Sequence, residues 1–229
     1  MDENKIPCHI GLIMDGNGRW AKKRLMPRSY GHNAGMNAMI KIAEHAKTRG
    51  VKYLTVYTLS TENLLRPQEE LEGLYGLFRK YFTKNVQKLY KSGAGVKVIG
   101  DISVLPQDVQ TLLSDGEKNS PKGCAFTLIF AINYGARSEM LRACNLAIER
   151  GEKLDANGLE SLLYTDGVPE PDLIIRTGGE KRLSNFLLYQ AAYSELYFTD
   201  TLFPDFDEGE LDKALEEYSR RERRFGKIK

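Results

Sequence analysis

Short apolar segments alternate with amphipathic segments along almost the whole chain, and this alternation is the feature that most limits the fold. Runs of β-branched and aromatic residues predict strands, and apolar residues at helical spacing predict helices. The expected strands are 9–14, 51–59, 96–100, 126–132, 172–175 and 195–198. The expected helices are 33–49, 68–91, 106–117, 135–150, 159–164 and 207–224.

This order of elements predicts an α/β fold, because parallel strands are joined by helices that bury the faces of the sheet. We expect a single domain over residues 1–229, with a central, mostly parallel, six-stranded sheet and helices on both faces. In open parallel sheets, ligands bind beyond the carboxyl ends of the strands. Polar or glycine-rich segments follow four of the expected strands and form the candidate site: 15–20, 60–66, 133–137 and 176–185.

Composition excludes several classes of protein. The net charge is only +2, so the chain lacks the basic excess of a general nucleic-acid-binding protein. Cys8, Cys124 and Cys144 form no Cys-x-x-Cys pair, which argues against a zinc site or a disulfide framework and favours a reducing compartment. The polar first residues are unlike a signal peptide, and no apolar run approaches the ~20 residues of a spanning helix. We expect a cytoplasmic protein that serves a membrane, if at all, from its inner surface.

The segment after the first expected strand, residues 15–20, has the composition of a magnesium–diphosphate site. Gly16 and Gly18 let backbone N–H groups approach a phosphate, and Arg19 can contact two diphosphate oxygens. Asp15 would repel a diphosphate unless Mg²⁺ lies between them, and Mg²⁺ is commonly held by a carboxylate together with substrate phosphates. The same residues also match a plain turn and a loose dinucleotide-binding pattern, so both alternatives stay open.

Two further polar residues lie shortly after this loop. Arg28 can close over a diphosphate bound there. His32 can contact the same ligand or handle a proton, although a lone histidine is often only structural.

The segment after the second expected strand, residues 60–66, is rich in polar side chains. Ser60 and Glu62 can supply a cap for the long helix that follows. Pro67 makes a better start for that helix, because proline suits the first helical position. This leaves Ser60, Asn63 and Arg66 as loop side chains at the ligand edge.

Residues 176–185, after the fifth expected strand, combine Arg176, Lys181 and Arg182 with two glycines. Arginines in such a turn bind phosphates well and predict a second anion site, with a solvated charged loop as the alternative. Glu195 is flanked by aromatic and apolar residues and is costly to bury alone. It is either a second carboxylate for the ion at Asp15 or one half of an ion pair with an arginine.

Common catalytic signatures are absent from the chain: there is no P-loop, no His-Glu-x-x-His and no Gly-x-Ser-x-Gly. A Rossmann-type nucleotide-binding oxidoreductase remains an alternative. It expects an acidic residue after the second strand, and Glu62 meets that expectation.

Taken in order, these segments resemble the cis-prenyltransferase family, specifically the bacterial undecaprenyl diphosphate synthases. The resemblance runs from His9 to Gly226. It rests on seven motifs: the segment 9–21 (HIGLIMDGNGRWA), Gly31-His32-x-x-Gly35, Ser60-Thr61-Glu62-Asn63, Asn133-Tyr134-Gly135, the segment 172–177 (DLIIRT), the segment 182–186 (RLSNF) and Tyr193-x-Glu195.

The resemblance implies a role for each matching residue. It makes Asp15 and Asn63 catalytic, and it has Asp15 bind Mg²⁺ with Glu195 reaching the same ion. The implied substrate contacts are Gly16, Asn17, Gly18, Arg19, Trp20, Arg28 and His32 for the starter diphosphate, Ser60, Thr61, Glu62, Leu64 and Arg66 at the reacting centre, and Arg176, Arg182, Leu183 and Ser184 for isopentenyl diphosphate. A neutral amide is a poor base, so Asn63 is expected to position the departing diphosphate.

By the same resemblance, the chain is a Mg²⁺-dependent enzyme that condenses isopentenyl diphosphate units onto an allylic diphosphate. The expected starter is farnesyl diphosphate, and the expected product is undecaprenyl diphosphate, the lipid-carrier precursor for cell-wall synthesis. The apolar stripe of helix 68–91 is the expected wall of a product tunnel, with ordinary core packing as the alternative. No Asp-Asp dipeptide is present, which excludes the all-helical trans-type prenyl synthases.

Partners and departures complete the comparison with the family. We expect a homodimer in which the basic segment 223–226 reaches the neighbouring subunit's diphosphate, and a product delivered to the membrane surface. The chain has Leu64 and Tyr189 where the family usually has tryptophan, and Lys181 replaces a frequent histidine. A non-catalytic accessory subunit is a further alternative, but such subunits lack the aspartate and arginines found here.

Overall fold

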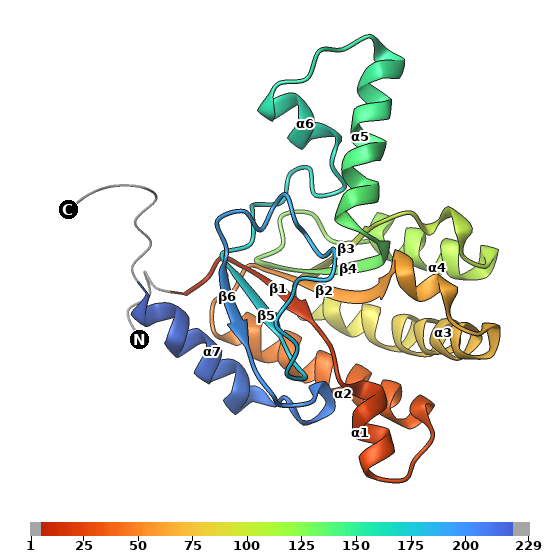
Figure 1. Ribbon diagram of the computed structural model, residues 1–229, viewed down its shortest axis with the longest axis vertical. Coiled ribbons are helices and arrows are strands. Elements are labelled where there is room, and N and C mark those ends of the chain that lie inside the picture. The colour runs from red at the N-terminus through yellow and green to blue at the C-terminus, as the bar shows by residue number, and fades with distance from the viewer. Residues whose placement is uncertain (1–5, 222–229) are drawn as a thin grey trace.

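The computed structural model describes residues 6–221, apart from the side chain of residue 85. Within this range six strands form one sheet in the order β3-β4-β2-β1-β5-β6, and every pair of neighbours is parallel (Figure 1). The strands are β1 (His9–Ile13), β2 (Tyr53–Ser60), β3 (Ala94–Ile99), β4 (Phe126–Tyr134), β5 (Leu173–Arg176) and β6 (Glu195–Phe198). The predicted α/β class and the predicted six-stranded sheet are confirmed, and the sheet is wholly parallel.

The helices lie between the strands as the sequence predicts, with ends shifted by a few residues. They are α1 (Asn17–Lys23), α2 (Arg28–Thr48), α3 (Gln68–Lys91), α4 (Gln107–Lys118), α5 (Ala136–Arg150), α6 (Ala156–Leu162) and α7 (Glu208–Arg220). Short 3₁₀ helices occur at η2 (Thr61–Leu65), η3 (Ile102–Val104) and η4 (Phe203–Asp205). The sequence missed α1, because a seven-residue helix that buries only Ala21 has no apolar stripe to detect.

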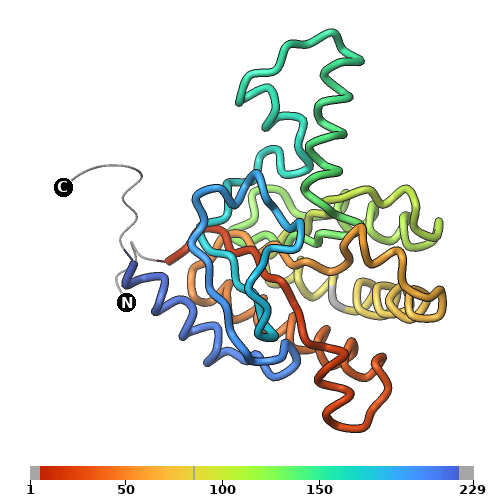
Figure 2. The backbone as a smooth tube through the Cα atoms, in the orientation of Figure 1, coloured from red at the N-terminus to blue at the C-terminus, as the bar shows by residue number. Residues whose placement is uncertain are grey.

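The two faces of the sheet are covered differently. One face carries the larger core, formed with side chains of α2, α3, α4 and α7. The other face is covered by the base of α5 and by Phe186, Leu187 and Ala191 of the long connection from β5 to β6. The rest of α5 extends away from the sheet and packs against α6 (Figures 1 and 2).

The register of the strands brings the predicted polar segments to one edge of the sheet. Ile13 pairs with Arg176, and Ser60 pairs with Tyr134, so the segments after β1, β5, β2 and β4 all begin at neighbouring positions. Residues from distant parts of the chain therefore meet beyond the carboxyl ends of the strands, as the parallel sheet requires.

Glycines allow the first loop to pack tightly at this edge. Gly16 has φ of 110°, a left-handed conformation that favours glycine, and a Cβ there would lie 2.9 Å from the Leu202 side chain. On α2, a Cβ at Gly31 would lie 2.0 Å from the backbone oxygen of Asn17, and one at Gly35 would lie 2.4 Å from the Asn17 side chain. The motif Gly31-x-x-x-Gly35 thus lets α2 approach the start of α1.

Membrane-spanning helices are not found in the described part of the chain, because none of its helices combines the necessary length and apolar character.

Candidate active site

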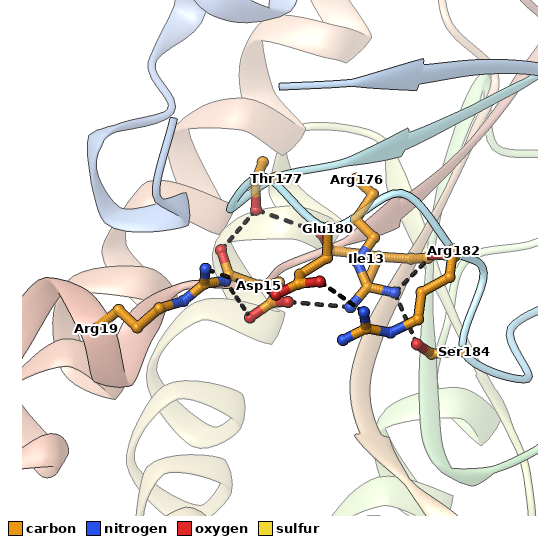
Figure 3. A network of polar contacts seen from close by, with 8 residues as sticks. All are labelled: Ile13, Asp15, Arg19, Arg176, Thr177, Glu180, Arg182 and Ser184. Atoms are coloured by element: carbon orange, nitrogen blue, oxygen red, sulfur yellow. Dashed lines mark hydrogen bonds and ion pairs between the residues drawn. The ribbon is translucent and has the colours of Figure 1, made fainter. Parts of the chain in front are cut away.

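The Asp15 carboxylate, just beyond β1, is held by two arginines, Arg19 of α1 and Arg176 at the end of β5 (Figure 3). Its Oδ2 accepts a hydrogen bond from Nη2 of Arg176 at 3.0 Å, and its Oδ1 lies 3.1 Å from Nη2 of Arg19. The Asp15 side chain is 31% exposed, whereas that of Arg176 is only 5% exposed. An exposed carboxylate between two cations is positioned to meet a further charged group from solvent.

Arg176 is the most enclosed cation of this edge, and its neighbours fix its orientation. It is the last residue of β5. Its Nη1 donates to the backbone oxygen of Arg182 at 2.6 Å and to Oγ of Ser184 at 2.7 Å. Its buried Nε has no hydrogen-bond partner among the described residues. A buried polar atom without a partner is costly, so this nitrogen is a vacant donor for a ligand.

Two cavities meet at Asp15. The first has a volume of about 680 Å³ and is lined by Met14, Asp15, Gly16, Asn17, Gly18, Arg19, Lys22, Leu25, Met26, Pro27, Arg28, His32 and Arg66. The second has a volume of about 570 Å³ and is lined by Ile13, Met14, Asp15, Tyr57, Ser60, Glu62, Asn63, Arg66, Arg137, Arg176, Ser184 and Asn185. They share Met14, Asp15 and Arg66, so the same aspartate and arginine face both spaces.

Glu70 organises the cations of the first cavity and was not predicted from the sequence. Its Oε1 lies 3.0 Å from Nη1 of Arg66, 3.6 Å from Nη2 of Arg28 and 3.7 Å from Nε2 of His32. Burial lowers the pKa of His32, and the charge of Arg66 lowers that pKa further, so the imidazole is neutral at pH 7. The signal in the sequence was the spacing of Arg66 and Glu70, four residues apart across the start of α3.

Ser60 and Asn63 form a reciprocal cap beside the second cavity. The Asn63 N–H donates to Oγ of Ser60, and the Ser60 N–H donates to Oδ1 of Asn63, both at 3.3 Å. The predicted cap of the long helix by Ser60 and Glu62 is therefore wrong, because Ser60 pairs with Asn63 and caps η2, while the long helix begins after Pro67. Both side chains still line the second cavity.

Asn185 is a second residue whose role was not predicted. Its Oδ1 accepts from the backbone N–H of Arg137 at 2.9 Å, and its Nδ2 donates to Glu62 at 3.1 Å. It has φ of 65°, a conformation that asparagine tolerates better than most residues. Asn185 thus joins the loop after β5 to the start of α5 and to η2.

The carboxyl group of Glu62 remains ionised at this junction. Burial alone would raise its pKa, but hydrogen bonds from its own backbone N–H and from Asn185 outweigh burial, and the pKa is lowered overall.

Five residues predicted to contact substrate do not line either cavity: Trp20, Thr61, Leu64, Arg182 and Leu183. The Trp20 indole N–H donates to Asp205 at 2.6 Å, which turns the ring toward η4. The Arg182 guanidinium is 2.5 Å from Glu180, and its side chain is 60% exposed. Trp20 thus faces η4, whereas Arg182 belongs to the charged network around Asp15, because its partner Glu180 also lies 4.0 Å from Nη1 of Arg19 (Figure 3).

Glu195 and Asp15, predicted to share an ion, do not meet within one chain. Glu195 is the first residue of β6 and pairs with Leu173, which itself pairs with Ile10 near the start of β1. It therefore lies at the amino edge of the sheet, at least ~10 Å from Asp15 along the strands at the usual rise per residue. Its carboxylate lies 2.7 Å from Nη1 of Arg221, so the ion-pair alternative holds within the chain. Side chains of one chain do not bring Glu195 and Asp15 to a shared ion.

The basic segment 223–226, predicted to reach a neighbouring subunit, lies outside the described residues.

The described residues contain no group of three or more His, Cys, Asp and Glu side chains that could hold a metal by themselves. Asp15 is nevertheless suited to Mg²⁺, since this ion commonly takes one carboxylate and completes its shell with water and phosphate oxygens. The two cavities beside Asp15 leave room for such oxygens.

An apolar groove leads away from the first cavity between α2 and α3. A small cavity of about 40 Å³ shares Asn17 and His32 with the first cavity and Met36 and Phe78 with the groove. The groove has a volume of about 270 Å³. The residues of α3 that line it include Phe78, Tyr81, Phe82, Val86 and Leu89, which also belong to the buried face of the helix. The stripe of α3 thus packs in the core and lines an apolar space.

Comparisons with known proteins match this architecture. Residues 13–226 match the family model described as putative undecaprenyl diphosphate synthase. An isoprenyl transferase of Fusobacterium nucleatum is 48% identical over 99% of both chains, and one of Streptococcus mutans is 49% identical over 98% of this chain and 95% of that protein.

Solved structures agree with the sequence relatives. A lavandulyl diphosphate synthase from Lavandula x intermedia, in complex with dimethylallyl diphosphate, has a TM-score of 0.93 and 35% identity, covering 98% of this chain and 100% of that chain. A probable undecaprenyl diphosphate synthase from Campylobacter jejuni has a TM-score of 0.82 and 32% identity, covering 96% and 99%. These findings give no support to the oxidoreductase alternative. The chain belongs to the undecaprenyl diphosphate synthase family and is a prenyltransferase.

Proposed function

We propose that this enzyme condenses isopentenyl diphosphate units onto an allylic diphosphate to make a long-chain polyprenyl diphosphate. Farnesyl diphosphate is the expected starter and undecaprenyl diphosphate the expected product. The observation that carries the proposal is the pair of cavities that share Asp15 and Arg66, because each cavity has its own cations and the two reactants must meet at one boundary.

The first cavity suits the allylic starter. Arg19 and Arg28 line it and can each bind diphosphate oxygens in a bidentate manner. The apolar groove adjoins this cavity, which gives the hydrocarbon chain a space away from water. The second cavity then receives isopentenyl diphosphate, with Arg176 and Ser184 at its diphosphate. The substrate contacts predicted for five residues stay expectations, since these residues do not line the cavities: Trp20, Thr61, Leu64, Arg182 and Leu183.

Asp15 would hold Mg²⁺ together with diphosphate oxygens. When bound, the ion supplies positive charge that stabilises the departing diphosphate. Within one chain, Glu195 is not part of this arrangement.

Residues of this chain have separate roles in charge stabilisation and in positioning the reactants. Arg19, Arg28 and Arg66 stabilise negative charge as the allylic carbon–oxygen bond breaks. The double bond of isopentenyl diphosphate then attacks that carbon, and loss of a proton sets the new double bond. Asn63 is a positioning residue, because its amide oxygen already accepts the Ser60 N–H. The departed diphosphate, held in the first cavity, is the proposed acceptor of the proton.

Several further expectations belong to the same proposal. The chain acts as a single catalytic domain, the subunits form a homodimer, and the product passes along the groove to a membrane surface on the cytoplasmic side. The fully matched length of the relatives supports the first of these. The apolar lining of the groove supports the path of the product.

The deciding experiment supplies the purified chain with Mg²⁺, farnesyl diphosphate and labelled isopentenyl diphosphate. Chromatography of the extracted products would give their chain length. Incorporation by the chain alone excludes a non-catalytic subunit. No incorporation with any allylic starter, by a correctly folded sample, would refute the proposal.

A further inference from the structure

The second half of α3 carries four exposed lysines: Lys80, Lys84, Lys88 and Lys91. At about 100° per helical residue these positions fall within ~80° of the helix circumference. They therefore form one row along the helix. The buried residues Phe78 and Phe82 and the partly buried Leu89 point the other way, toward the groove and core. We call these four residues the lysine row.

The lysine row lacks acidic partners among the described residues. Lys84, Lys88 and Lys91 form no ion pair there, and Lys80 lies 5.3 Å from the centre of the Tyr81 ring. The neighbouring Arg79, by contrast, is 2.5 Å from Asp108. Lysines near the carboxyl end of a helix are also favoured by the helix dipole. The lysine row by itself therefore does not show that a binding partner exists.

The position of the row beside the apolar groove supplies the second observation. Lys88 belongs to the row and also lines the groove. Across the groove, Lys47 of α2 donates a hydrogen bond to the backbone oxygen of Ser92, where α3 ends. The end of the groove farthest from Asp15 is thus apolar inside, and the charged residues that line the groove are Lys47, Lys88 and Glu44. A partner that fits this edge combines negative charge outside with hydrocarbon inside.

We propose that this side of the molecule docks on an anionic lipid surface, with the lysine row against the headgroups and the end of the groove facing the lipid. Charge complementarity selects the occupant, since anionic headgroups attract lysines and the acyl region accepts an apolar chain. A nucleic acid would use the charge but not the groove. The use of this surface for product release rests on the proposed function, whereas the docking itself does not.

The attraction is local to this surface. The net charge of the chain is only +2, so the molecule as a whole is weakly attracted to anionic membranes. Each basic side chain near such a surface strengthens binding by about fivefold. Removal of two lysines should therefore weaken binding about 25-fold, and moderate salt should screen the attraction, with a Debye length of ~8 Å.

The test is sedimentation of the purified chain with vesicles, in the presence of inorganic diphosphate and without prenyl substrate. The diphosphate occupies the arginines around Asp15, so that they do not contribute to binding. Vesicles of phosphatidylcholine alone are compared with vesicles that also contain phosphatidylglycerol. Three double variants are used: Lys84→Gln with Lys91→Gln, Lys84→Arg with Lys91→Arg, and the matched control Lys52→Gln with Lys153→Gln. The two control lysines are exposed and lie in connecting segments outside α3.

We expect the unaltered chain, the arginine variant and the control to bind the phosphatidylglycerol vesicles, and the Lys84/Lys91 glutamine variant to lose about 25-fold in affinity. Equal loss in the control would overturn the proposal, as would unchanged binding by the glutamine variant. Failure to sediment with anionic vesicles, or binding that RNA removes fully, would also overturn it. Because no turnover is measured, a failed docking test leaves the proposed reaction standing, and an inactive enzyme leaves the docking result interpretable.

Discussion

The two ends of strands β1 and β5 carry polar clusters of opposite character. At the amino end, His9 is buried and both ring nitrogens have partners: Nδ1 is 2.6 Å from the Pro169 oxygen and Nε2 is 2.7 Å from Oγ1 of Thr55. The Asp172 carboxylate accepts the backbone N–H groups of Cys8 and His9 at 2.8 and 3.2 Å. This end holds polar groups that the protein satisfies by itself.

The carboxyl end holds polar groups whose hydrogen bonds the protein itself does not complete. Five buried side-chain atoms among the described residues lack a hydrogen-bond partner, and three of them belong to the cavity residues Asn17, His32 and Arg176. None belongs to the His9 cluster. Since an unpaired buried polar atom costs free energy, it persists where a ligand completes the bonding. The difference separates a structural cluster from a binding site on the same two strands.

The largest effect is expected at the carboxyl end. Asp15→Ala should retain the fold but lose about 10³-fold in turnover, or roughly 4 kcal/mol, because the charge that holds the ion is removed. Incorporation of labelled isopentenyl diphosphate measures the loss, and circular dichroism measures the fold. Asp115→Ala, on the exposed side of α4, is the matched control and should be unaffected. Near-normal activity of Asp15→Ala would refute the metal assignment.

At the amino end the expected effect is on stability. Burial lowers the pKa of His9 to about 4 in the folded chain. Between pH 6.5 and pH 4 this histidine therefore binds a proton in the unfolded chain but stays neutral in the folded chain. The free energy of unfolding should therefore fall by about 3 kcal/mol between pH 6.5 and pH 4 from this group alone. Urea unfolding across this range measures it, with His9→Asn as the reference that lacks the titrating ring. An identical pH slope in the two proteins would contradict the prediction.

Arg176→Gln should raise the KM for isopentenyl diphosphate by 10- to 100-fold, because a charged hydrogen bond is worth about 2 kcal/mol. The KM for the allylic starter should change less. Lys181→Gln removes a charge from the same loop outside the cavity lining and should leave both values near normal. An equal rise in KM for both substrates would contradict the assignment of one diphosphate to each cavity.

Asn185→Ala tests whether the Asn185 side chain, whose role was not predicted, holds the loop after β5 in place. Loss of its bonds to the Arg137 N–H and to Glu62 should cost about 1 kcal/mol of stability and lower turnover severalfold. Thermal unfolding and steady-state kinetics measure the two effects. Asn185→Asp keeps the acceptor for Arg137 but faces the Glu62 carboxylate, so it should recover stability only in part. Full activity in both variants would count against this positioning role.

The solved relatives show that a shared fold does not determine which product an enzyme of this architecture makes. One solved structure with a TM-score of 0.93 is a lavandulyl diphosphate synthase, whereas another is a probable undecaprenyl diphosphate synthase. The same architecture thus accompanies different named products. Under the proposed function, side chains that shape the apolar groove would set product length, and chromatography of the products is the direct measurement.

Glu195 lies apart from Asp15 within one chain, so its predicted role at the same ion stays a prediction. Its place as the first residue of an expected parallel strand already put it at the amino edge of the sheet. The family resemblance nevertheless predicted that Glu195 and Asp15 bind the same ion. Glu70 was missed because a carboxylate in the charged first turn of a helix is usually exposed to solvent. Only the packing of α3 shows that it faces Arg28 and His32.

The sequence by itself determined the α/β class, the parallel sheet and the polar segments at its carboxyl edge, because hydrophobic periodicity and strand order are local properties of the chain. It also indicated Asp15, Arg19 and Arg176. Only the tertiary structure decided that both arginines hold Asp15 and that Trp20 turns away toward Asp205. Those outcomes depend on which distant side chains compete for each hydrogen bond, and that competition exists only after the chain has packed.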